Sequence, residues 1–205
     1  MNATAQERAF GSTVQLLALS PLLAVSDTVI KAIGFNIVVL IVVPASTLLL
    51  GLIRRWLDEH IVLAAGLLIT AGLVTAMELL LRAWFHDLGE SFGVFLPLLA
   101  VNIILVDHIR TTHSDHVTAL VRSVRISLGI ALTLLALGFA RELVGRGSLL
   151  NGAGTLLASW AERFEVKVFS VDMGFLLAML PPGAFISLGL LIAARNWLAR
   201  RAPNS

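Results

Sequence analysis

The chain has 205 residues, of which 58% are hydrophobic and 14% charged, with a mean hydropathy of +0.91. One water-soluble core cannot hide so many apolar side chains, so the composition predicts a polytopic membrane protein and argues against a soluble domain. The net charge of +2 forms no basic stripe interleaved with aromatic residues, which argues against nucleic-acid binding, and the lack of cysteine excludes disulfides and thiolate ligands.

Uncharged stretches of the sequence predict six membrane spans. In chain order they are 9–26, 32–53, 61–77, 91–106, 126–140 and 173–194. A straight crossing helix needs about 20 apolar residues, which the second and sixth stretches supply. The third stretch has to continue through 79–81, which brings Glu78 into its span. The fifth stretch is short, but 117–121 can extend it if Arg122 and Arg125 extend their charged groups towards the interface. The first and fourth stretches are therefore expected to form short or half-crossing helices.

The same five residues, PLLAV, occur at 21–25 and again at 97–101, inside the first and fourth stretches. Each copy begins with a proline, Pro21 or Pro97, which removes a helical hydrogen bond and clashes with the preceding turn. Broken helices at matching positions are typical of membrane proteins built from two inverted repeats. The alternative is a chance recurrence in a chain rich in leucine, alanine and valine.

The repeat predicts an all-α integral membrane protein with six transmembrane helices in two inverted three-helix halves. These halves, at about 10–85 and 86–198, form a single membrane domain over 1–205, in which the first and fourth helices are broken or half-length. Positively charged loops tend to stay in the cytoplasm. The excess of arginine on the amino-terminal side, strongest at Arg54 and Arg55, therefore predicts that both termini are cytoplasmic.

The longest connection, 145–172, is expected on the extracytoplasmic side. Its apolar residues recur at steps of three and four between Leu149 and Val168, which predicts an amphipathic helix with Asn151 as a candidate cap. Such a helix lies on the membrane surface or docks onto a partner subunit, and the two are not exclusive.

The sequence shows no catalytic constellation, and no Gly-Lys-Ser/Thr phosphate-binding loop that would indicate an NTPase. His113 and His116 are interpreted as part of a polar loop, because no further ligand stands at a suitable spacing for a metal site. Glu78 lies one helical turn before Arg82, which predicts an ion pair; the alternative is a place on an ion path. Asn102 is a polar residue beside the second PLLAV sequence.

Four blocks of sequence resemble the NqrD/RnfE family of bacterial membrane subunits. They are VQLLALSPLLAV at 14–25, FLPL at 95–98 followed by Asn102, RELVG at 141–145, and FLLAMLPPGAFI at 175–186. In the last block, 181–183 (PPG) is expected to kink the final span. The resemblance covers roughly 10–198. It implies a membrane subunit of an Rnf-type complex, which couples electron transfer between NADH and ferredoxin to Na⁺ or H⁺ translocation across the bacterial inner membrane.

The resemblance also implies partners: an RnfA-like membrane subunit as the closest, then the B, C, D and G subunits, with lipid around them. The subunit itself would be non-catalytic, within a redox-driven ion translocase. The alternatives are a small stand-alone secondary transporter and a purely structural assembly subunit.

In the family each broken helix brings one cysteine to a [2Fe–2S] cluster shared with RnfA. Those two positions hold Ser20 and Ile103 here. Iron–sulfur clusters are held chiefly by thiolates, with histidine as the known substitute. We therefore expect this chain to hold no cofactor and no metal.

Overall fold

The computed structural model describes residues 23, 25–101, 116–150, 152, 154, 166–167, 178 and 180–201. Their elements are α3 (Val29–Arg54), α4 (Val62–Trp84), α5 (His86–Phe92), α6 (Phe95–Leu98), α8 (His116–Arg146), β1 (Ser148–Leu149), β2 (Val166–Lys167) and α11 (Pro181–Arg201). Three of these helices, α3, α4 and α8, are long and apolar enough to cross a membrane. The predicted helical membrane protein is confirmed to this extent, and the count of six spans stays a prediction.

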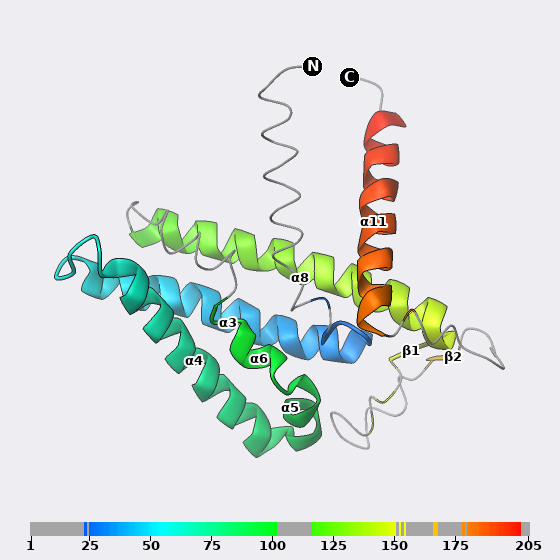
Figure 1. Ribbon diagram of the computed structural model, residues 1–205, viewed down its shortest axis with the longest axis horizontal. Coiled ribbons are helices and arrows are strands. Elements are labelled where there is room, and N and C mark those ends of the chain that lie inside the picture. Colours follow the sequence, from blue (N-terminus) through cyan, green and yellow to red (C-terminus); the bar gives the residue numbers. More distant parts are fainter. Residues whose placement is uncertain are drawn as a thin grey trace.

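Helices α3 and α8 form the centre of the fold, side by side and antiparallel (Figure 1). Asn36 on α3 donates from Nδ2 to the carbonyl oxygen of Ala131 on α8 at 3.0 Å. Val29, at the start of α3, contacts Glu142 near the end of α8, so the two helices run in opposite directions. Helix α4 packs against α3, and α11 contacts α8 and rises away from the pair. Fully buried aliphatic and aromatic side chains fill the interface, among them Phe35, Val38 and Leu134.

Two glycines allow the backbones to approach closely. A Cβ added at Gly138 of α8 would lie 3.1 Å from the Cβ of Ala32 and 3.2 Å from the carbonyl oxygen of Thr28. A Cβ at Gly34 of α3 would lie 2.8 Å from Cδ2 of Leu88 on α5. Small residues at helix contacts are the usual means of close packing in membrane proteins, where dispersion contacts drive association.

The second, third and fifth stretches correspond to α3, α4 and α8, but the predicted end of the fifth is wrong. The prediction ended this span at residue 140 because Arg141 and Glu142 are charged. The structure continues α8 to Arg146. Both side chains are buried and have hydrogen-bond partners, so the charges do not require the helix to leave the membrane there.

The fourth stretch is interrupted twice. As predicted, helix ends within the second PLLAV sequence, because α6 stops at Leu98 and residues 99–101 form a turn. A further interruption precedes it. Gly93, with φ of +47°, separates α5 from α6, and a glycine tolerates this conformation because it has no Cβ. Pro97 lies in the first turn of the four-residue α6, where a missing N–H leaves no helical hydrogen bond unmade. The first stretch ends as expected: Leu23 and Val25 are helical, and residues 26–28 turn into α3.

The predictions for the carboxyl-terminal third need one correction. The expected disturbance of helix at 181–183 is present: Ala178 is helical, Leu180 is a bend, and α11 begins at Pro181, where the fixed φ of proline suits a first turn. Helix α11 continues to Arg201, and the earlier part of the predicted span 173–194 lies mostly outside the described residues, so the length of this span stays a prediction. Within 145–172, β1 pairs antiparallel with β2, which contradicts a helix running from 149 to 168 at both of its ends; Asn151 lies outside the described residues.

Candidate functional site at the helix interruptions

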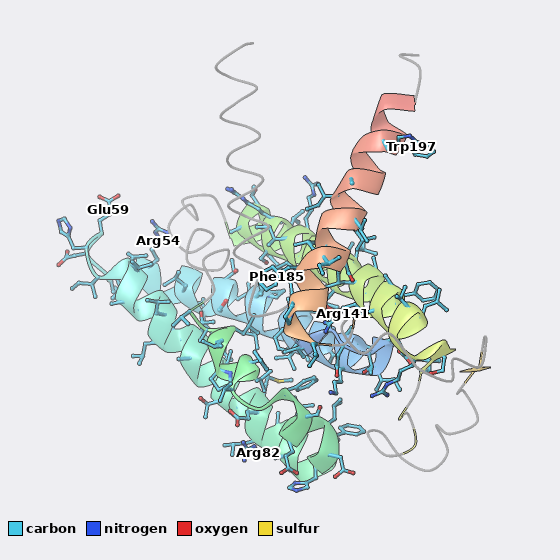
Figure 2. The ribbon with its side chains drawn as sticks, turned by 45° about the vertical axis from the view of Figure 1, so that its right-hand side comes forward. Arg54, Glu59, Arg82, Arg141, Phe185 and Trp197 are labelled. Atoms are coloured by element: carbon cyan, nitrogen blue, oxygen red, sulfur yellow. The ribbon has the colours of Figure 1, made fainter. Side chains whose placement is uncertain are left out.

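The end of α8 carries two adjacent charged side chains, Arg141 and Glu142, which are both 0% exposed. Figure 2 shows Arg141 at the start of α11. It is therefore close to three places where the chain leaves regular helix: the turn before α3, the end of α8, and the segment before α11. Buried charges in a membrane-spanning helix are costly unless they are paired, so their partners define the site.

Arg141 binds backbone carbonyl groups of two segments that are far apart in sequence. Its Nη1 donates to the carbonyl oxygen of Leu23 at 2.7 Å. Its Nε donates to Ala178 at 2.9 Å, and its Nη2 donates to Leu180 at 3.3 Å. A guanidinium suits this task because it presents several N–H donors in a fixed planar arrangement. The side chain thus joins the segment before α3 to the segment before α11.

Glu142 binds the amino-terminal end of α3. Its Oε2 accepts a hydrogen bond from the backbone N–H of Val29, the first residue of that helix, at 2.8 Å. The first N–H groups of a helix have no intrahelical partner, and the helix dipole favours a negative charge beside them. The hydroxyl of Thr28 caps the same end by accepting from the Lys31 N–H at 3.3 Å. The close approach at Gly138, one turn earlier on α8, brings Glu142 within reach.

Asp27 and Lys31 bring the number of charged side chains at this junction to four. Lys31 Nζ lies 2.8 Å from Asp27 Oδ2, and the charge of Asp27 interacts favourably with that of Arg141. The second carboxylate oxygen, Asp27 Oδ1, is buried and has no hydrogen-bond partner within the described part of the chain. Two cationic and two anionic groups therefore offset one another, which reduces the penalty of removing each from water.

Of the predicted site residues, Glu78, Arg82 and Pro97 belong to the described part of the chain, and they lie on α4 and α6. Arg82 Nη2 lies 2.7 Å from Glu78 Oε1 on α4, so the predicted ion pair is present, with Arg82 well exposed. Figure 2 places Arg82 well apart from Arg141. Pro97 lies in α6. Ser20, Pro21, Asn102 and Ile103 lie outside the described residues.

Sequence reasoning quoted Arg141 and Glu142 as part of a resembling block but assigned them no role. A signal was available: an Arg-Glu pair directly follows a long uncharged run, and a Pro-Pro-Gly sequence later in the chain frees carbonyl groups. The sequence analysis treated charged residues as the ends of spans, so it did not consider that Arg141 could bind the carbonyl groups beside the Pro-Pro-Gly sequence.

The donor set of the chain does not fit a four-thiolate [2Fe–2S] cluster. The sequence contains no cysteine, and the described residues contain no group of three or more histidine, aspartate or glutamate side chains that could hold a metal ion. The carbonyl oxygens of Leu23 and Ala178 at the interruptions are bound by Arg141.

The family model for "Rnf-Nqr subunit, membrane protein" matches residues 7–192. The chain belongs to the Rnf-Nqr family of membrane subunits. This family match confirms the resemblance found in the sequence blocks, and its range includes positions 20 and 103 as well as the Arg141–Glu142 pair.

Three similar proteins are each named as the E subunit of an ion-translocating oxidoreductase complex. That of Aliivibrio fischeri is 39% identical over 190 residues, covering 92% of this chain and 84% of the relative. That of Vibrio parahaemolyticus is 42% identical over 185 residues, covering 89% and 80%. That of Shewanella loihica is 40% identical over 190 residues, covering 92% and 82%. This Rnf-Nqr chain is therefore similar to these relatives over most of both lengths.

Proposed function

We propose that this Rnf-Nqr subunit is the E-type membrane subunit of an ion-translocating oxidoreductase complex in the bacterial inner membrane. The observation that carries the proposal is the similarity, at about 40% identity over most of both chains, to relatives that bear this name. The structure supports it with a buried charged junction between interrupted segments, because broken helices in membrane proteins persist where other groups satisfy the freed backbone.

The architecture that goes with this function is two inverted halves of three spans each, at about 10–85 and 86–198, with both termini in the cytoplasm. The chain leaves helix after Val25 and again after Leu98, near the ends of the two PLLAV sequences, which supports the pairing of the two halves. In such repeats the interruptions approach the middle of the membrane from opposite faces. We place an RnfA-like subunit as the direct partner, with further Rnf subunits and lipid around the pair.

The proposal is tested by purifying the tagged chain from membranes of its native host and identifying the proteins that accompany it. We expect an RnfA-like subunit together with the flavin- and ferredoxin-like subunits of the complex. Membrane vesicles from a deletion strain should lose ion uptake coupled to electron transfer between NADH and ferredoxin, and a plasmid copy should restore it. A chain that purifies alone and still moves ions would instead support a stand-alone transporter. Restored assembly without any ion uptake would support a structural subunit.

The purified subunit pair should contain no [2Fe–2S] cluster of the four-thiolate kind, since this chain supplies none of its half of the ligands. The test is iron content together with electron paramagnetic resonance after reduction. Replacing Ser20 and Ile103 with cysteine serves as the comparison, because this change restores the family's ligand positions. A stoichiometric [2Fe–2S] signal in the unchanged pair would contradict the prediction.

A further inference from the structure

The carbonyl groups around Arg141 lie where the chain leaves regular helix, so their hydrogen bonds differ from those of a continuous helix. In a continuous helix the carbonyl of Ala178 would accept from the N–H of residue 182, but Pro182 has none. The carbonyl of Leu180 accepts from the N–H of Gly183 at 2.9 Å in a tighter turn. The carbonyl of Leu23 accepts from Ser26 Oγ at 3.0 Å. Each of these oxygens then receives a donor from Arg141.

Backbone carbonyls freed at unwound segments are the groups with which membrane transporters coordinate monovalent cations. Here the three oxygens converge on one cationic centre at 2.7 to 3.3 Å. The cation that fills this carbonyl cage, formed by the oxygens of Leu23, Ala178 and Leu180, is the guanidinium of the chain itself. Glu142, the next residue, binds the N–H of Val29, which follows the turn before α3, whereas Leu23 precedes that turn.

We propose that Arg141 is a tethered cation and the positioning residue that fixes the interruption before α3 to the segment before α11. The carbonyl cage accepts a free guanidinium-type cation once the Arg141 side chain is removed. This role rests on the proposed function. In an ion-translocating complex, the Arg141 contacts would couple a movement of the segment before α3 to a movement of the segment before α11.

The geometry requires a guanidinium and not merely a positive charge. Nη1 reaches the segment before α3, whereas Nε and Nη2 reach the segment before α11, so a planar group with spread donors spans both. A lysine ammonium is a compact point charge on a flexible stem and cannot reproduce this spread. We therefore expect Arg141→Lys to keep the charge but to loosen the connection.

The first experiment uses the whole complex purified from native membranes. Arg141→Ala should lower its thermal midpoint, and ethylguanidinium, which replaces the missing atoms, should raise it again with saturation. Tetramethylammonium, a cation without N–H donors, should not. The matched control is Arg125→Ala, an exposed arginine on the same helix, which should change neither the midpoint nor its response. Equal effects of both cations, or an Arg141→Ala complex as stable as the control, would overturn the carbonyl cage.

The second experiment uses Arg141→Lys, which keeps a donor cation and so protects the test against a variant that fails to fold. In proteoliposomes we expect fewer ions moved per electron transferred, by about twofold or more, at an electron-transfer rate close to that of the unchanged complex. An unchanged ratio would contradict the positioning role. If the unchanged complex itself moved no ions, the proposed function would fail, whereas rescue by ethylguanidinium would still establish the carbonyl cage.

Discussion

Substituting alanine for Gly138 should increase the distance between α8 and the start of α3. The new methyl carbon would lie 3.2 Å from the carbonyl oxygen of Thr28 and 3.1 Å from the Cβ of Ala32. Neither neighbour is the end of a flexible side chain, so one helix has to shift. Overpacking of this kind costs about 1 to 3 kcal/mol, whereas replacing glycine by alanine inside a helix returns up to about 1 kcal/mol. The predicted net loss is about 0 to 3 kcal/mol.

Gly129→Ala on the same helix is the matched control, because nothing lies within 4 Å of the added carbon. It should stabilise the protein by up to about 1 kcal/mol, so the two variants should differ by about 1 to 3 kcal/mol in the free energy of unfolding. Titration of the purified chain in mixed micelles with a denaturing detergent, followed by helical circular dichroism, measures this difference. Equal free energies of unfolding would refute the close approach of Gly138 to Thr28, and with it the reason Glu142 reaches α3.

Two further predictions concern the surface pair on α4 and the topology. Glu78→Gln should lower the free energy of unfolding by no more than about 0.5 kcal/mol, since the i, i+4 pair is partly solvated. Adding Arg82→Gln should partly relieve this loss. An assembled Glu78→Gln complex that transfers electrons but moves no ions would instead make Glu78 part of the ion path. Ser159→Cys, the sole thiol in an otherwise cysteine-free chain, should react with a membrane-impermeant reagent in intact spheroplasts, and labelling only after lysis would reverse the proposed orientation.

Hydropathy located the three long spans well, because the bilayer demands long apolar helices whatever the tertiary packing. The second stretch, 32–53, corresponds to α3 within three residues at each end. The extension of the third through Glu78 corresponds to α4. The i, i+4 spacing likewise predicted the contact between Glu78 and Arg82, since both residues belong to one helix and no distant segment takes part.

Prolines were less reliable as signals of where helices break. The sequence identified runs that could not be continuous helices, but it could not distinguish a proline that kinks a helix from one that begins it. Pro97 and Pro181 both lie in first turns, where the missing N–H causes no loss. The fourth stretch is interrupted at Gly93, which has a positive φ, as well as after Leu98 within the PLLAV sequence, and the sequence analysis identified only the second of these breaks.

The charged junction was decided by tertiary structure alone. Leu23 and Arg141 are 118 residues apart in sequence, and no local pattern connects a freed carbonyl in one segment to a guanidinium in another. Composition determined that the protein lies in a membrane and that its chain offers no thiolate to a cluster. The antiparallel contact of α3 with α8 determined that Arg141 and Glu142, which end a span in a hydropathy profile, stay buried: in the folded chain their charges are satisfied by carbonyl oxygens and a helix terminus that only packing brings together.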